Sequence, residues 1–125
     1  MVPEELAASR YVSLVTHRRD GTAVPTPVWA AADGPELLVW TRTDSGKVRR
    51  LRRDGQVTVA PCDVRGRTGG TDPAQGQARL LEPEQLSRVR SALRRKYGWQ
   101  FRLFDAGQAL LRRGRQVHTG IAVTF

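Results

Sequence analysis

Three cations stand at the start of a short helix that the sequence predicts after residue 44. Lys47, Arg49 and Arg50 fall in its first turns, directly after an apolar strand over 37–42. The N-terminus of a helix carries partial positive charge and normally attracts acidic side chains, not basic ones. Cations and free backbone N–H groups gathered at one point are explained by a bound anion, most simply a phosphate. The alternative is a solvated basic helix face that binds nothing.

Hydroxyl side chains flank these cations and could donate to the same anion. Thr41 and Thr43 lie at the end of the strand, and Ser45 stands where it could cap the helix and bind at once. Strand propensity alone would also explain the two threonines. Lysine is rare in this chain, where Lys47 and Lys96 are the only two, and a compact ammonium does not replace a guanidinium freely. We therefore expect an anion site at the turn from strand to helix.

Side chains typical of metal sites or nucleophilic catalysis are few and far apart. Cys62 lies in an apolar strand without a second cysteine nearby, which is typical of a small buried hydrophobe. His17 and His118 lie near strand ends, and neither has a second ligand at metal-binding spacing. No Ser/His/Asp set and no carboxylate pair stands out. We therefore predict neither a metal site nor a catalytic side chain.

Length and composition indicate one globular domain, 1–125. The chain has 125 residues, a hydrophobic fraction of 39% and a single cysteine, which excludes an intramolecular disulfide and a zinc ribbon. It opens without the basic-then-apolar pattern of a signal peptide. No apolar run approaches the roughly 18–20 residues of a membrane span. We expect a cytoplasmic protein without membrane association.

The net charge of +9 favours an anionic partner, which could be nucleic acid, anionic lipid or a small ligand. The nucleic-acid alternative depends on two predicted helices, over 83–96 and 99–114. A helix-turn-helix needs exposed polar residues near the start of its second helix. Here that helix opens with Trp99-Gln-Phe-Arg, which is typical of inward packing. A nucleic-acid-binding module is therefore the more distant alternative.

Strands predominate among the predicted elements. The Asp20-Gly21 pair marks a hairpin, and Asp33-Gly34-Pro35 marks a second turn. Pro25 and Pro27 require their strand to lie at an edge or to contain a bulge. The pattern predicts a mainly β fold, a small antiparallel barrel with helical additions. Strands are expected over 11–17, 24–32, 37–42, 56–62, 74–81 and 117–125, helices over 2–9, 45–53, 83–96 and 99–114, and a loop over 63–73.

The order of these motifs resembles a known family. The hairpin at Asp20-Gly21 is followed by Pro25-Thr-Pro-Val-Trp29, then Thr41-Arg-Thr43, Ser45-Gly-Lys-Val-Arg-Arg-Leu51 and Val57-Thr-Val-Ala-Pro-Cys-Asp63. This set resembles the split β-barrel flavin and deazaflavin oxidoreductases, the superfamily of pyridoxamine 5′-phosphate oxidase. More narrowly it is similar to their actinobacterial members that use coenzyme F420 in place of FMN. The resemblance runs from about Tyr11 to the final strand.

The resemblance implies an FMN-binding split barrel of six or so antiparallel strands plus a C-terminal helical hairpin. It also implies a homodimer with a cofactor in each of two grooves between subunits. The strand-to-helix turn would grip the cofactor phosphate, and the hairpin's return strand and the strand after the helix would border its ring. Trp29 and Trp40 could flank that ring or belong to the core. By motif position the cofactor-binding residues are Thr26, Pro27, Val28, Trp29, Thr41, Arg42, Thr43, Ser45, Gly46, Lys47, Arg50, Pro61 and Cys62.

The function implied is an oxidoreductase that transfers a hydride between reduced coenzyme F420 and an unsaturated small organic substrate. An FMN-dependent enzyme of the same fold, or a cofactor-binding protein without turnover, is the alternative. F420 carries a phosphodiester and a polyglutamate tail, so it presents more negative charge than FMN. Arginines beyond those that one phosphate needs, including Arg65 and Arg67 in the 63–73 loop, could hold that tail.

Overall fold

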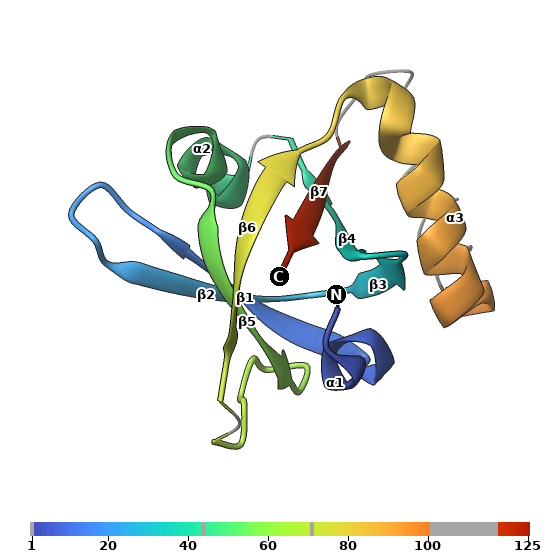
Figure 1. The fold of residues 1–125 in the computed structure, drawn as a ribbon, viewed down its shortest axis with the longest axis horizontal. Helices are drawn as coiled ribbons and strands as arrows, with labels where there is room; N and C mark the ends of the chain where they lie inside the picture. The colour runs from blue at the N-terminus through green and yellow to red at the C-terminus, as the bar shows by residue number, and fades with distance from the viewer. Residues whose placement is uncertain (1, 44, 71, 101–117) are drawn as a thin grey trace.

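The computed structural model describes residues 2–43, 45–70, 72–100 and 118–125 (Figure 1). In these described segments the strands form one sheet of seven, accompanied by three helices and a short 3₁₀ turn. In chain order the elements are α1 (Glu4–Ala8), β1 (Tyr11–His17), β2 (Ala23–Val28), β3 (Ala30–Asp33), β4 (Glu36–Arg42), α2 (Gly46–Arg53), β5 (Gln56–Cys62), β6 (Ala74–Leu80), η1 (Pro83–Gln85), α3 (Leu86–Tyr97) and β7 (His118–Thr124).

The strand order makes the sheet a split barrel. The order is β2-β1-β5-β6-β7-β4-β3, and every neighbouring pair is antiparallel. β2 and β3 lie at opposite edges, yet a single residue, Trp29, separates them in the chain. A sheet whose two edges are joined by one residue must curl until those edges approach each other. The predicted antiparallel barrel is therefore confirmed, as an incompletely closed one.

The predicted single strand over 24–32 is wrong, because the chain changes sheet partner in its middle. Ala23–Val28 pairs with β1, with Val12 opposite Val28, whereas Ala30–Asp33 pairs with β4, with Ala30 opposite Val39. Proline has no N–H to give to a second neighbouring strand, so Pro25 and Pro27 restrict β2 to an edge. The expectation of an edge strand is confirmed, and Trp29 is the corner between the two edges.

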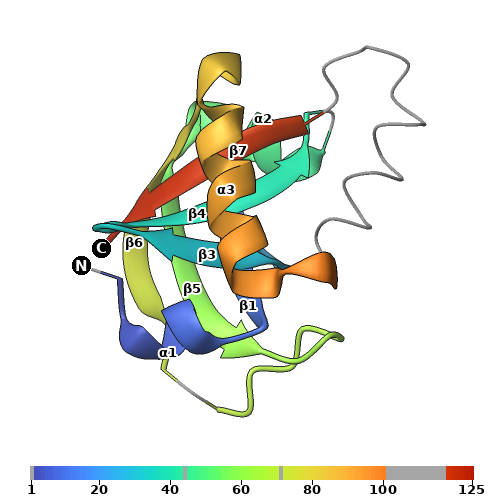
Figure 2. The same cartoon turned by 90° about the vertical axis from the view of Figure 1, so that its right-hand side faces the viewer.

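Two apolar clusters stabilise the fold, one inside the barrel and one under α3. Along β4, Leu37 and Val39 point into the barrel with Leu14, while Leu38 points outward to Leu93; this is the two-residue alternation of a strand. Figure 2 shows α3 crossing the outer face of β3, β4 and β7. The helix ends at Gly98, whose φ of 63° favours glycine.

The short basic helix α2 is held by its apolar face, as the spacing of Val48 and Leu51 predicts. Val48 is fully buried and Leu51 joins the barrel interior. The N–H of Asp54 donates to the carbonyl of Arg50 and ends the helix. Lys47 lies off this apolar face and is half-buried. The anchoring of α2 thus leaves its cations available for other contacts.

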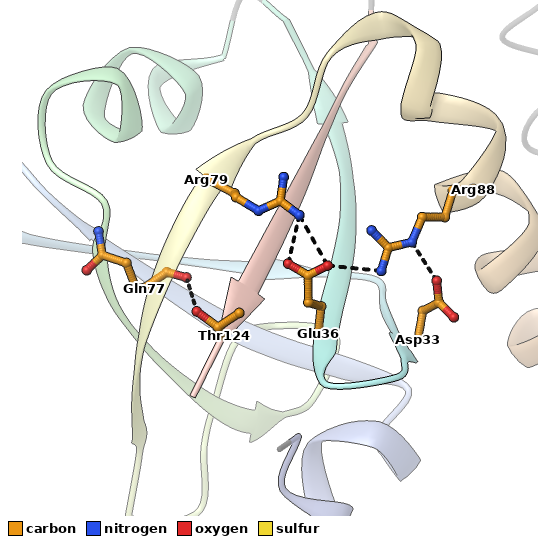
Figure 3. A network of polar contacts seen from close by, with 6 residues as sticks. All are labelled: Asp33, Glu36, Gln77, Arg79, Arg88 and Thr124. Carbon is orange, nitrogen blue, oxygen red and sulfur yellow. Dashed lines mark hydrogen bonds and ion pairs between the residues drawn. The ribbon is translucent and has the colours of Figure 1, made fainter.

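A nearly buried carboxylate ties the β3–β4 hairpin to β6 and α3 (Figure 3). The side chain of Glu36 is 11% exposed and accepts two hydrogen bonds from Arg79, at 2.9 and 3.2 Å. It accepts a third from Arg88 at 3.0 Å, and Arg88 also donates to Asp33 at 2.6 Å. Burial raises the pKa of Glu36, but the hydrogen bonds and charges of Arg88 and Arg79 outweigh it, so the pKa lies below its usual value.

The first helix of the predicted C-terminal helical hairpin is present as η1 and α3, whereas nearly all of the second lies outside the described residues. The helix expected over 99–114 falls there except for residues 99 and 100. The expectation that Trp99 packs inward is wrong, since this residue is 68% exposed. Within the described residues, no helix is long and apolar enough to cross a membrane.

Candidate functional site

A cavity of about 380 Å³ opens at the corner where the barrel edges meet. It lies beside the N-terminus of α2, and Leu93 of α3 also borders it. Six strands and helices contribute to its wall, so it is built almost entirely from segments that are distant in sequence. Its lining residues are Tyr11, Pro27, Val28, Trp29, Trp40, Thr41, Arg42, Lys47, Leu93 and His118.

Two stacked aromatic pairs form much of this wall. Trp29 stacks on Tyr97, with ring centroids 4.7 Å apart and an interplanar angle of 16°. Trp40 stacks on His118 at 4.8 Å and 29°, and the Arg90 guanidinium lies 5.1 Å from the Trp40 ring centroid. Both tryptophans are only partly buried. Flat, partly open aromatic faces suit a planar ligand, because aromatic rings favour offset stacking.

Lys47 supplies a cation at the α2 end of the cavity. Burial, and next the charge of Arg50, lower the pKa of its ammonium. In the part of the chain that the structure describes, no hydrogen bond or ion pair reaches this side chain. A partly desolvated charge without a counter-charge is costly unless an anion joins it. The cavity therefore combines an aromatic, largely apolar body with a cationic end.

Of the three predicted hydroxyl donors, only Thr41 lines the cavity, and Thr43 and Ser45 lie outside its lining. Thr41 lines the cavity, and its Oγ1 lies 3.4 Å from Ser45 Oγ. Thr43 instead makes a 2.9 Å hydrogen bond with Thr119 of β7 and borders a separate hollow. Ser45 caps α2 only by its backbone position, since its side chain makes no capping hydrogen bond.

Arg50, predicted to share the phosphate with Lys47, lies in a different hollow of about 370 Å³ on the far side of α2. Its Nε donates to Thr16 Oγ1 at 2.6 Å, and Arg53 donates to the carbonyl of His17 at 2.6 Å. Burial, and then the charges of neighbouring arginines, lower the pKa of Arg50. We call this feature the arginine hollow. It is lined by Arg18, Arg19, Gly46, Arg49, Arg50 and Arg53.

Three further predicted residues lie beside the cavity without lining it. Cys62 and Pro61 of β5 pair with Tyr11 and Val12, and Thr26 of β2 pairs with Leu14. Burial, and then the charge of Asp63, raise the pKa of the Cys62 thiol, which disfavours the reactive thiolate form. Within the described residues, no group of three His, Cys, Asp or Glu could hold a metal ion.

Four lining residues were absent from the set assigned by motif position: Tyr11, Leu93, His118 and Trp40, the last of which was expected either to flank the ring or to belong to the core. The hairpin register could have indicated Tyr11: continuing the pairing of Val12 with Val28 by one residue places Tyr11 opposite Trp29. Leu93 and His118 depend on how α3 and β7 are placed against β4. No local sequence signal carries that information.

Comparisons with known proteins agree with this fold. A family model described as pyridoxamine 5′-phosphate oxidase matches residues 2–119, whereas no curated protein matches the chain. A conserved hypothetical protein from Mycobacterium tuberculosis is 26% identical, with a TM-score of 0.67 over 98% of this chain and 79% of its own. A heme storage protein from Vibrio cholerae is 13% identical, with a TM-score of 0.69 over 97% and 84%. A structure described as an F420 reductase is 20% identical, with a TM-score of 0.60 over 98% and 94%.

Proposed function

This chain belongs to the pyridoxamine 5′-phosphate oxidase family, and we propose that it is an oxidoreductase that uses coenzyme F420 in the aromatic cavity. In this proposal a hydride passes between the reduced cofactor and an unsaturated small organic substrate. The observation that carries it is Lys47, a half-buried cation without a described partner at one end of a cavity walled by two tryptophan rings. FMN-dependent chemistry, or binding without turnover, is the alternative.

The residues present fit a planar, phosphorylated cofactor. Lys47 would hold the phosphate as a point charge, with Thr41 and Arg42 at the same end of the cavity. Trp29 and Trp40 would border the ring system and exclude water from it. When bound, the cofactor supplies the redox chemistry, and the protein supplies orientation and electrostatics.

The arginine hollow favours F420 over FMN within this proposal. Gly46 lines the hollow and its neighbour Lys47 lines the cavity, so a ligand with its phosphate at Lys47 can reach the hollow across the start of α2. Arg67 of the loop, the other candidate for the tail, is paired with Asp63 at 3.0 Å. Within the described residues, no ion pair engages the arginines of this hollow. One solved neighbour is described as an F420 reductase, which agrees with this choice.

The deciding experiment adds FMN and F420 separately to the purified apoprotein and follows binding by fluorescence and Tm. We expect F420 to bind more tightly and to raise the Tm, since a ligand that binds the folded state stabilises it. Tight FMN binding without F420 affinity would reverse the choice of cofactor. Submicromolar nucleic-acid binding at physiological salt, without a thermal shift from either cofactor, would favour the nucleic-acid alternative. Turnover with an unsaturated acceptor separates an enzyme from a binding protein.

The affinity for F420 should depend on the salt concentration and on the length of its polyglutamate tail. Arg49→Ala combined with Arg53→Ala is expected to weaken long-tailed F420 roughly 3- to 10-fold at low salt while leaving FMN binding unchanged, and this difference should shrink as salt screens exposed charges. Arg52→Ala is the matched control, because Arg52 borders a different hollow. Arg65→Ala with Arg67→Ala tests the loop as the competing tail site. Equal losses for FMN and F420 in the Arg49/Arg53 variant would contradict the assignment.

We also propose that the protein is a homodimer whose second subunit closes the cavity. Among the described strands β2 pairs with β1 alone, and Pro27, which lines the cavity, is exposed. Unprotected edges are normally covered, and an isologous contact would cover this one in both subunits. We expect sedimentation to show a dimer at micromolar concentration with cofactor present. Monomer alone under those conditions would contradict it.

A further inference from the structure

Tyr97, the last residue of α3, is anchored to two backbone segments at once. Its side chain is buried, and its hydroxyl accepts a hydrogen bond from the N–H of Ala30 at 3.1 Å. The hydroxyl has one proton to donate, either to the carbonyl of Arg10 at 2.7 Å or to that of Ala30 at 3.1 Å. Arg10 and Ala30 immediately adjoin Tyr11 and Trp29, two residues of the cavity wall.

The ring of Tyr97 acts on the same corner as its hydroxyl. It stacks on Trp29, nearly parallel and 4.7 Å away, and Trp29 in turn lines the cavity. Trp29 is the single residue between β2 and β3. Because Trp29 belongs to neither strand, the orientation of its ring depends on the side chains that pack against it.

Lys96 reinforces this anchor. Its Nζ donates to the carbonyls of Ser9 and Ala30 at 2.6 and 2.5 Å and lies 5.1 Å from the centroid of the Tyr97 ring. Burial lowers the pKa of Lys96 to about 8, whereas the two carbonyls and the ring favour its charged form. The α1–β1 turn and the start of β3 are thus held together by adjacent residues of one helix.

We propose that Tyr97 is a positioning residue that fixes the Trp29 ring as a wall for the planar ring of the cofactor. Its hydroxyl holds the backbone on both sides of the cavity corner, and its ring sets the tilt of Trp29. The ligand part of this inference rests on the proposed function. The effect on Trp29 does not, because it belongs to the protein without ligand.

The test follows Trp29 by fluorine NMR of protein labelled with 5-fluorotryptophan, with its signal assigned by Trp29→Phe. In the apoprotein, Tyr97→Phe and Tyr97→Leu are expected to shift or split the Trp29 signal while leaving that of Trp99 unchanged. Leu86→Ala is the matched control, because Leu86 is buried at the opposite end of α3. It should lower the Tm without changing the Trp29 signal.

In the same variants, Tyr97→Phe is expected to raise the Kd for F420 roughly 3- to 10-fold, as for one lost hydrogen bond. Leu86→Ala should leave this Kd unaltered. An unshifted Trp29 signal in both Tyr97 variants would overturn the inference, as would equal losses of F420 affinity in Tyr97→Phe and Leu86→Ala. Failure of the unaltered protein to bind F420 refutes the proposed function instead, and the apoprotein spectra still decide the role of Tyr97.

Discussion

Lys47→Ala is expected to weaken F420 binding by about 1–3 kcal/mol, the cost of losing a charge-assisted hydrogen bond. The reason is the placement of this ammonium at the cationic end of the cavity, half-buried and without a described partner. Fluorescence titration of the apoprotein with F420 measures the change. FMN affinity should fall as well, because both cofactors carry a phosphate.

The Tm of the apoprotein separates binding from folding in this variant. Lys47 lies off the Val48 and Leu51 face that anchors α2, so its removal should leave the Tm unchanged. Any change in the Tm should be upward, because a desolvated charge is lost. Arg52→Ala, on the same helix but exposed beside another hollow, is the control and should bind F420 normally. Unchanged F420 affinity in Lys47→Ala, with an intact thermal transition, contradicts the anion-site assignment.

Most of the fold could be predicted from local signals. The Asp20-Gly21 turn and the alternation around it determine the β1–β2 hairpin, because turn position fixes register. Pro25 and Pro27 determine that β2 lies at an edge, since neither can donate to a second strand. The spacing of Val48 and Leu51 indicates which face of α2 is buried. These features depend on residues close together in the sequence.

The break at Trp29 could not be predicted, because it depends on partners that are distant in sequence. The segment 24–32 is continuously compatible with a strand, and only the closure of the barrel transfers its second half to β4. The same applies to Leu93 and His118, which reach the cavity through the packing of α3 and β7. Local patterns specify elements, whereas the cavity wall is a property of their assembly.

The basic turn shows the limit of motif spacing most directly. Lys47 and Arg50 are three residues apart, which on a helix places them on neighbouring sides, and one shared phosphate was the simplest expectation. In the structure the long Arg50 side chain bonds to Thr16 of β1, while Lys47 lines the cavity. Helical spacing gives the direction of a Cβ atom. The end of a long side chain follows its hydrogen-bond partner.

Glu36→Ala is expected to lower the free energy of unfolding by about 2–3 kcal/mol, because it removes the shared acceptor of two arginines from a nearly buried position. Because Arg79 and Arg88 are partly exposed, water still solvates their charges after the substitution. The loss in free energy of unfolding therefore stays near the lower end of the range for breaking a buried ion pair. Urea unfolding at neutral pH measures it. Arg79→Ala is the control: its side chain is 53% exposed and Glu36 would keep Arg88, so less than about 1 kcal/mol should be lost.

The pH dependence of unfolding tests the same network independently. Because the pKa of Glu36 is lower in the folded state than in the unfolded chain, the unfolded state binds more protons between the two values, and stability rises with pH across that window. The contribution is complete above the ordinary glutamate pKa and is lost as pH falls through the lowered one. Glu36→Gln keeps the shape but cannot titrate, so its unfolding midpoint should fall less steeply with acid than that of the unaltered protein. Parallel pH profiles for the two proteins would show that the charge of Glu36, held between Arg79 and Arg88, does not stabilise the junction of β4, β6 and α3.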